Sequence, residues 1–175
     1  RFVDIAGLVA GASKGEGLGN KFLSHIRETD AIAEVVRCFE DENITHVSGS
    51  VDPLRDIDII NTELCLADLE TTQKRADRLN KIAKSGDKAA KAELAVLEKV
   101  LTCLENGEGA RKAQLTKDEL PLLKELNLLT LKPILYICNV AEDEAATATE
   151  NPLVQKVTEF AAAEGSQVVA VSAKI

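Results

Sequence analysis

The sequence has 175 residues, of which 45% are hydrophobic and only 3% aromatic, and its net charge at pH 7 is −8. A chain of this length can bury one substantial hydrophobic core, so we expect one domain with an appendage. The negative charge argues against nucleic-acid binding over the whole surface, and we expect no DNA partner, because phosphate contacts require Lys and Arg.

No stretch of the sequence approaches the roughly 20 apolar residues that a membrane helix requires. The first residues also lack the charged and then apolar pattern of a signal peptide. We therefore expect no membrane partner and a cytoplasmic location. Arg1–Asp4 has the pattern of the end of a buried strand, so we expect the chain to be a fragment of a longer protein.

The four cysteines each lie singly in an apolar run, and no two of them form a CxxC pair. This pattern is typical of small buried thiols in a reduced compartment. We expect neither a disulfide nor a zinc site at Cys38, Cys65, Cys103 and Cys138.

The first part of the chain combines apolar runs with a glycine-rich loop. We expect Phe2 and Val3 to end a strand and residues 4–20 to form a loop. Five glycines in this loop permit unusual backbone dihedrals and close approach to a ligand. A short helix is predicted around residues 21–27, and the β-branched run 31–39 predicts a buried parallel strand.

Beyond the polar, turn-rich residues 40–53, the apolar residues recur at helical spacing. Two such series flank the turn sequence Ser85–Asp87, which predicts two antiparallel helices joined by a tight turn. Thr116 and Glu119 have the spacing of a capping box and predict a short third helix. The series are Ile57, Ile60, Leu64, Ala67, Ala76, Leu79 and Ile82, then Ala90, Leu94, Leu97, Leu101 and Leu104.

Strand patterns return near the end of the chain. Residues 133–138 predict a strand, Asn151 caps a helix that ends at Gly165, and residues 168–171 predict a last strand. This order predicts an α/β fold, in which a parallel sheet is interrupted by an inserted antiparallel helical hairpin. We divide the chain into a nucleotide-binding domain over 1–53 and 129–175, and a helical insertion over 54–128.

Ligands bind at the carboxyl ends of parallel strands, so the residues that follow each strand are the candidates for function. Asp4 and Gly7 follow the first strand. An aspartate there can hold Mg²⁺ through water, and a glycine N–H three residues later can approach the terminal phosphate of a nucleotide. The alternative is a loop in which Asp4 is a cap and Gly7 serves only the turn geometry.

Asn139, Val140 and Glu142 follow a later strand, and this loop resembles the base-reading loop of GTPases. In such a loop an aspartate accepts the two donors of guanine, but here the longer Glu142 takes its place and Val140 stands where a lysine is usual. We therefore predict that guanine selectivity is lost and that ATP is preferred over GTP. The alternative is a solvated acidic loop over residues 142–144.

Ser172, Ala173 and Lys174 follow the last strand. They match the loop whose backbone N–H groups support the base from its other side. A tripeptide carries little information alone, but its position after the third strand end strengthens the prediction of a nucleotide site.

Several longer strings make the resemblance specific, and they cover most of the chain. The chain resembles the Obg-like, YchF-type ATPase family, whose members have a P-loop nucleotide-hydrolase fold with a coiled-coil arm, followed by a TGS domain. The resemblance implies ATP and Mg²⁺ as cofactors and the ribosome as a partner. The strings lie at residues 2–12, 15–20, 26–31, 36–39, 51–53 and 129–133.

The 175 residues contain no GxxxxGK[ST] motif, which in this family cradles the phosphates and supplies a Ser or Thr ligand of Mg²⁺. We therefore expect these residues alone not to hydrolyse ATP. Ras-type GTPases have a glutamine after the DxxG glycine, but here the residue is Leu8, which cannot hydrogen-bond water. We expect slow hydrolysis that depends on another group, on a second cation such as K⁺, or on a partner.

His46 is the candidate for the group that positions the attacking water, because a histidine can accept a proton near neutral pH. The alternative is a polar loop histidine without a catalytic part. His25, in the predicted short helix, is interpreted as a surface or packing residue.

The predicted hairpin turn is basic, with seven basic residues against Asp77 and Asp87, a local charge of +5. This charge suits contact with RNA phosphates, and the resemblance implies ribosome association, with rRNA as the partner. The alternative is a solvated helical face, since no aromatic residues are interleaved for base stacking. The basic residues are Lys74, Arg75, Arg78, Lys81, Lys84, Lys88 and Lys91.

The sequence thus predicts an ATP-binding, slowly hydrolysing domain of a ribosome-associated regulatory ATPase. A second hypothesis is a non-catalytic adaptor that binds ribosomes or RNA and uses nucleotide only as a switch. A third is a GTPase of the Obg group.

Overall fold

The computed structural model describes residues 2–3, 19–40 and 50–173, with side chains in the first helix described from Leu23 onward. The chain divides into two compact units. Residues 30–59 and 133–175 form one, called here the sheet unit, and residues 1–29 and 60–132 form the other, called the hairpin unit. None of the helices in the described ranges is long and apolar enough to cross a membrane.

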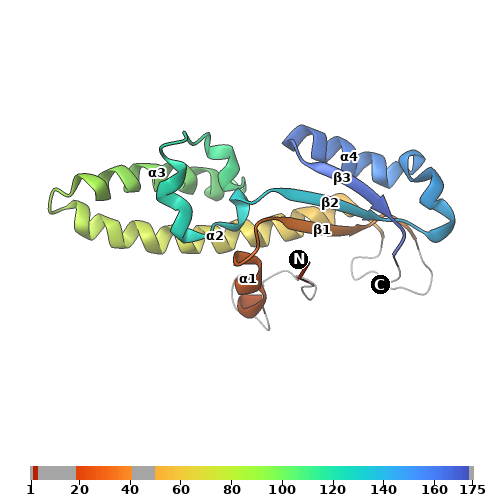
Figure 1. Ribbon diagram of the computed structural model, residues 1–175, viewed down its shortest axis with the longest axis horizontal. Coiled ribbons are helices and arrows are strands. Elements are labelled where there is room, and N and C mark those ends of the chain that lie inside the picture. The colour runs from red at the N-terminus through yellow and green to blue at the C-terminus, as the bar shows by residue number, and fades with distance from the viewer. Residues whose placement is uncertain (1, 4–18, 41–49, 174–175) are drawn as a thin grey trace. The chain divides into compact units, whose positions relative to one another are not determined.

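The sheet unit contains three parallel strands in the order β1-β2-β3, as Figure 1 shows. Their bounds are Ile32–Arg37 for β1, Ile134–Asn139 for β2 and Gln167–Val171 for β3. The register places Val35 beside Ile137 and Ile137 beside Val169, so the three strands end at the same edge. The predicted parallel α/β fold is confirmed.

Phe2 and Val3 do not form the strand end that the sequence predicts. They lie in no strand and are 95% and 49% exposed. A strand requires a hydrogen-bonded neighbour, and within the described residues neither β1, β2 nor β3 pairs with them.

The helix α4 (Pro152–Glu164) connects β2 to β3 after the 3-10 segment η5 (Glu142–Glu150). Asn151 caps it, since its side-chain oxygen accepts hydrogen bonds from the backbone N–H groups of Leu153 and Val154 at 2.8 and 3.4 Å. Gly165 ends it with φ of 80°, a left-handed conformation that glycine adopts without strain. Both predicted ends of this helix are therefore confirmed.

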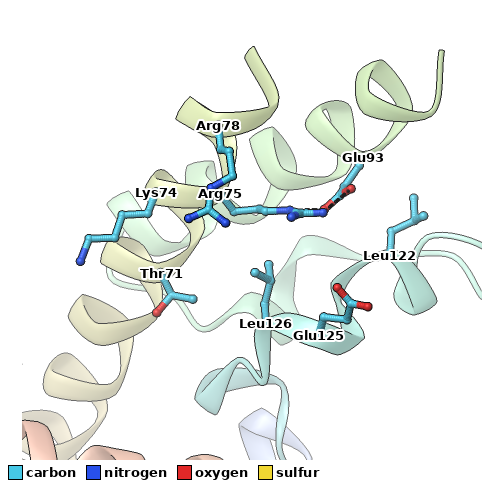
Figure 2. Close-up of a pocket in the computed structure, with 8 residues that line it drawn as sticks. All are labelled: Thr71, Lys74, Arg75, Arg78, Glu93, Leu122, Glu125 and Leu126. Carbon is cyan, nitrogen blue, oxygen red and sulfur yellow. Dashed lines mark hydrogen bonds and ion pairs between the residues drawn. The ribbon is translucent and has the colours of Figure 1, made fainter. Parts of the chain in front are cut away.

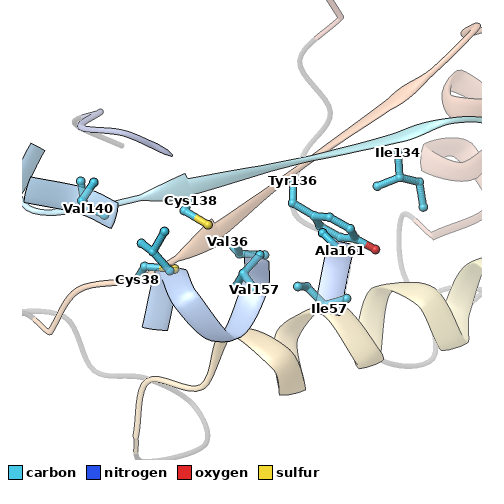
Figure 3. Close-up of a cluster of buried hydrophobic side chains, with 11 residues drawn as sticks. Val36, Cys38, Ile57, Ile134, Tyr136, Cys138, Val140, Val157 and Ala161 are labelled. Atoms are coloured by element: carbon cyan, nitrogen blue, oxygen red, sulfur yellow. The ribbon is translucent and has the colours of Figure 1, made fainter. Parts of the chain in front are cut away.

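The core of the sheet unit lies where α4 and the start of α2 pack on one face of the strands (Figure 3). Tyr136 is fully buried at its centre, with its ring edge-to-face against Phe160 at 5.9 Å. The Tyr136 hydroxyl donates to Glu164 at 2.6 Å, which satisfies the only polar atom of that side chain. The buried members are Val36, Cys38, Ile57, Ile134, Tyr136, Cys138, Val140, Ala148, Val154, Val157 and Ala161.

The hairpin unit contains α1 (Gly19–Arg27) and the predicted pair of antiparallel helices, α2 (Pro53–Ala83, whose first turns belong to the sheet unit) and α3 (Lys88–Glu105) (Figure 1). The turn between α2 and α3 contains Gly86 at φ 91°. Asp87 then caps α3, because its carboxylate accepts a hydrogen bond from the N–H of Ala90 at 2.9 Å.

Three short 3-10 helices follow α3, namely η2 (Ala110–Ala113), η3 (Leu120–Leu126) and η4 (Leu129–Leu131). The predicted capping box forms only in part. The N–H of Glu119 donates to the Thr116 hydroxyl at 3.2 Å, but the Glu119 carboxylate binds Lys99 at 2.8 Å. The third helix is therefore a 3-10 helix that begins at Leu120 and not an α-helix with a reciprocal cap.

The hairpin unit has a core of its own, in which Leu97 and Val100 are fully buried. Truncating a leucine at such a position typically costs about 2–5 kcal/mol. The buried members come from α2, α3 and the segments that follow α3: Cys65, Ala76, Leu79, Ala90, Val96, Leu97, Val100, Leu104, Ala110, Leu123 and Leu128.

Candidate functional site

The predicted site residues fall into two groups. Asp4, Gly7 and Leu8 lie outside the described residues, as do His46 and Lys174. Their roles stay predictions. The base-reading residues and the end of the last strand are described, and these residues define the candidate site.

Asn139 ends β2 and ties it to the segment after β3. Its side chain is almost fully buried, at 1% exposure. The amide nitrogen donates to the carbonyl of Ala173 at 3.1 Å, and the amide oxygen accepts from the N–H of Ala173 at 2.9 Å. The N–H of Val140 also donates to the carbonyl of Val171 at 2.9 Å. The two predicted base-binding loops are therefore held side by side.

The residues of the two predicted base-binding loops differ in what they can contact. Val140 is 2% exposed and belongs to the core of the sheet unit, whereas Glu142 is exposed at the first position of η5. Ser172 is exposed as well. Among the predicted base-binding residues that the structure describes, Glu142 and the segment after β3 therefore present groups to a ligand at this edge, and Val140 acts through packing.

Arg37 at the end of β1 was missed as a site residue by the sequence reasoning. It pairs in register with Asn139, so it lies at the same edge of the sheet. Its Nε donates to the carbonyl of Phe39 at 3.0 Å, and its guanidinium lies 4.9 Å from the centre of the Phe39 ring. A positive charge is thus fixed beside the predicted nucleotide loops.

The cysteines are all free thiols, three of them buried. Burial raises the pKa of Cys65 to about 11, with the nearby Asp68 charge adding to the effect. Such a thiol remains protonated at neutral pH. In the described part of the chain, no group of three or more His, Cys, Asp and Glu side chains could hold a metal ion.

The basic residues near the hairpin turn divide into paired and unpaired cations. Lys74 binds Glu70, and Arg75 forms a bidentate pair with Glu93 at 2.7 and 3.0 Å. The other five are exposed and have no ion pair within the described residues. We call these the tip cations: Arg78, Lys81, Lys84, Lys88 and Lys91.

Asp68 is the second polar residue that the sequence reasoning missed. It is 1% exposed on α2, and its carboxylate accepts hydrogen bonds from the N–H groups of Leu129 and Thr130, both at 2.8 Å, and from the Thr130 hydroxyl at 2.6 Å. The Thr130 hydroxyl accepts in turn from the N–H of Ala110 at 2.8 Å. The sequence contains one indication that Asp68 is buried, because it lies four residues after Leu64 and so falls within the apolar helical series.

Lys132 and Arg27 attach α1 to the same region of the hairpin unit. The Lys132 ammonium group donates to the carbonyls of Arg27, at 3.2 Å, and of Thr29, at the C-terminal end of α1. Arg27 donates to the Thr71 hydroxyl of α2 at 3.5 Å. A cation at a helix C-terminus is stabilised by the helix dipole, so Lys132 holds α1 by charge and by hydrogen bonds.

Comparison with known proteins gives a consistent result, although no protein-family model matches the chain. The "Ribosome-binding ATPase YchF" of Haemophilus influenzae is 60% identical over 174 residues, which cover 99% of this chain. The protein of the same name from Bacillus subtilis is 56% identical over 174 residues, again 99% of the chain. The chain is homologous to the YchF proteins.

A solved YchF structure agrees with the fold. The "Structure of the Schizosaccharomyces pombe YchF GTPase" superposes with a TM-score of 0.77 at 37% identity, over 89% of this chain and 43% of that one. The chain spans about half the length of the YchF relatives that it matches, 47% and 48% for the two bacterial proteins. The names of these relatives differ on the nucleotide, since the bacterial proteins are called ATPases and the yeast protein a GTPase.

Proposed function

We propose that this chain is the part of a ribosome-associated, slowly hydrolysing ATPase that binds the adenine base and carries the ribosome contact. The names of the YchF relatives support both the ATPase activity and the ribosome partner. The structural support is the reciprocal pair of hydrogen bonds between Asn139 and Ala173, because it fixes two loops at the carboxyl edge of the sheet.

The base preference rests on Glu142 and Val140. A buried Val140 cannot cover a nucleotide as a lysine can, and an exposed Glu142 has one methylene more than the aspartate of a guanine reader. Both features favour ATP over GTP. Asn139 has one lone pair and one amide hydrogen beyond those bound to Ala173, and we propose that its main role is to position the loop at residues 172–174.

The phosphate end of the site is proposed from the sequence alone. Asp4 would hold Mg²⁺ through water, Gly7 would approach the terminal phosphate, and Leu8 would leave the attacking water without a side-chain partner. His46 is proposed to position that water, and K⁺ is the candidate second cation. The P-loop of a longer chain would supply the remaining phosphate contacts. We propose the domain limits 1–53 with 129–175, and 54–128.

The ribosome contact is proposed to be made by the tip cations with rRNA phosphates. Five exposed cations without an ion pair within the described residues provide the charge that phosphate contacts need. Such an assembly would act in the cytoplasm, with no DNA and no membrane as a partner. A non-catalytic adaptor remains the second candidate, and negligible ATP turnover by the intact protein with ribosomes present would favour it.

The experiment that tests base selection is competition of ATP and GTP, each with Mg²⁺, against a fluorescent nucleotide bound to the full-length protein. We expect ATP to compete better, and Glu142→Asp to shift the preference toward GTP by about tenfold. Asp143→Glu is the control, because it changes an exposed neighbour by the same methylene. A preference for GTP in the unchanged protein would favour a GTPase, as the yeast relative is called. Binding of neither nucleotide would favour the adaptor.

A further inference from the structure

A groove of about 360 Å³ lies on the hairpin unit between α2 and η3. Its lining residues on α2 run from Thr71 to Arg78, before the turn that joins α2 to α3. Figure 2 shows its lining side chains, which come from α2, α3 and η3. This volume can hold one or two side chains of a partner. The lining residues are Thr71, Lys74, Arg75, Arg78, Glu93, Leu122, Glu125 and Leu126.

One wall of the groove is a cationic stripe of α2. Lys74, Arg75 and Arg78 are spaced so that they share one helix face. The bidentate contact with Glu93 fixes the middle residue, Arg75, and both side chains are well covered, at 30% and 15% exposure. Arg78 has no ion pair within the described residues and is available to a partner.

The opposite wall, on η3, is partly apolar. Leu122 and Leu126 line it, and Leu122 is 40% exposed although it faces the groove. Glu125 adds a carboxylate on the same segment. An exposed leucine beside a fixed arginine fits the buried part of a protein interface, which is more apolar than the rest of the surface and enriched in Arg.

The groove and the tip cations therefore have different chemistry. The tip cations are four lysines and Arg78, which also lines the groove, and they outnumber the two carboxylates of the same stretch, Asp77 and Asp87, by five to two, which suits a phosphate backbone. The groove is lined by Leu122 and Leu126, which a phosphate backbone cannot use, and two of its three cations are already paired, Lys74 with Glu70 and Arg75 with Glu93. These features favour a protein segment over RNA as the occupant of the groove.

We propose that the groove between α2 and η3 docks a segment of a ribosomal protein that presents carboxylates beside an aliphatic side chain. One of these carboxylates binds Arg78, which leaves the four lysines of the tip cations to rRNA, while the aliphatic side chain packs on Leu122 and Leu126 and Glu125 accepts a backbone N–H. The identity of the partner rests on the proposed ribosome association, whereas the chemistry of the segment rests on the groove.

The test is photo-crosslinking of the full-length protein to purified ribosomes, with a photoreactive residue at Leu122 or, separately, at Ile82. Both positions are exposed, at 40% and 44%, and Ile82 lies among the tip cations. We expect Leu122 to crosslink to a ribosomal protein and Ile82 to rRNA. A Leu122 product with rRNA alone, or no Leu122 product where Ile82 gives one, overturns the proposal.

A matched pair of variants provides the affinity measurement. Leu122→Ser removes the apolar contact and is expected to weaken ribosome co-sedimentation about fivefold. Leu120→Ser changes a similarly exposed leucine of η3 that does not line the groove, and it is expected to have no effect. Equal ribosome affinities for the two variants contradict the proposed docking in the groove, provided that both variants keep the thermal unfolding midpoint of the unchanged protein.

Failure of the groove differs from failure of the proposed function in these data. If the unchanged protein does not co-sediment with ribosomes, the proposed ribosome association fails and the ribosomal partner fails with it. The groove alone is wrong under a different set of results. The unchanged protein then co-sediments with ribosomes and the photoreactive residue at position 82 crosslinks, but the one at position 122 gives no product and Leu122→Ser leaves the ribosome affinity unchanged.

Discussion

Each of the two units has a buried polar side chain that ties distant parts of the chain, Asn139 in one and Asp68 in the other, but the two ties differ in charge. In the sheet unit, the neutral amide of Asn139 exchanges one donor and one acceptor with Ala173. In the hairpin unit, the carboxylate of Asp68 accepts three hydrogen bonds from Leu129 and Thr130.

The difference in charge has an energetic consequence. Burial of a neutral amide costs little free energy when both of its polar groups find hydrogen-bond partners. A buried carboxylate has a large desolvation cost, which its hydrogen bonds must offset. Burial raises the pKa of Asp68, and the hydrogen bonds from Thr130 and Leu129 lower it in part. The Asp68 tie therefore depends on an ionisable group, whereas the Asn139 tie does not titrate.

The largest expected effect comes from removal of the charged tie. Asp68→Ala leaves the N–H groups of Leu129 and Thr130 and the Thr130 hydroxyl without their acceptor, which should cost at least about 3 kcal/mol of unfolding free energy. Urea unfolding and amide hydrogen exchange in α3 would measure it. Asp77→Ala is the control, because Asp77 is exposed on the same helix and contacts only Gln73 among the interactions described. Similar losses for the two variants would contradict the Asp68 network.

Removal of the neutral tie should have a smaller effect. Asn139→Ala deletes the two hydrogen bonds with Ala173 and should cost about 2 kcal/mol. It should also weaken nucleotide binding by the full-length protein, since the segment after β3 loses its anchor. Asn80→Ala, at an exposed position of α2, is the control for both measurements. If Asn139→Ala binds nucleotide with unchanged affinity, the hydrogen bonds between Asn139 and Ala173 do not contribute to the nucleotide site.

The elements with regular local signals could be predicted from the sequence. The apolar series from Ile57 to Leu104 predicts α2 and α3, and the caps Asn151 and Gly165 predict both ends of α4. The residues after β2 and β3 were predicted to lie at one edge, and Asn139 and Ala173 do meet there. The helix predictions depend on periodicity and caps, which act over a few residues, and the shared edge follows from the rule that parallel strands bring their carboxyl ends together.

Features that depend on distant partners could not be predicted. The partners of Asp68 lie 61 and 62 residues further along the chain, and Arg75 finds Glu93 18 residues away. The same limit explains Glu119, whose carboxylate binds Lys99 on α3 instead of completing a local cap. A distant side chain that competes for a polar group leaves no trace in local spacing.

The pH dependence of stability would sharpen the contrast between the two ties. The folded-state pKa of Asp68 is raised above its usual 3.8, so the unfolded chain releases this proton first as the pH rises. The contribution of Asp68 is thus fully present below pH 3.8 and is lost as the pH rises through the folded-state pKa. We expect the difference in unfolding free energy between the unchanged protein and Asp68→Asn to fall over that range. The same difference measured for Asn139→Ala should stay constant, and a parallel fall there would assign the effect to other groups.

The smallest expected effects concern the two ion pairs of α2, which differ in exposure. Lys74 and Glu70 are 71% and 57% exposed and one turn apart, so solvent screens their attraction and the pair should contribute at most about 0.5 kcal/mol. Arg75 and Glu93 are more covered and form two hydrogen bonds between α2 and α3, so about 1 kcal/mol is expected. Double-mutant cycles with alanine and glutamine variants, followed by urea unfolding, would measure both coupling energies. Equal values would mean that Arg75 is not held more firmly than a surface lysine, and the wall of the groove would then lack the rigidity that the bidentate pair gives it.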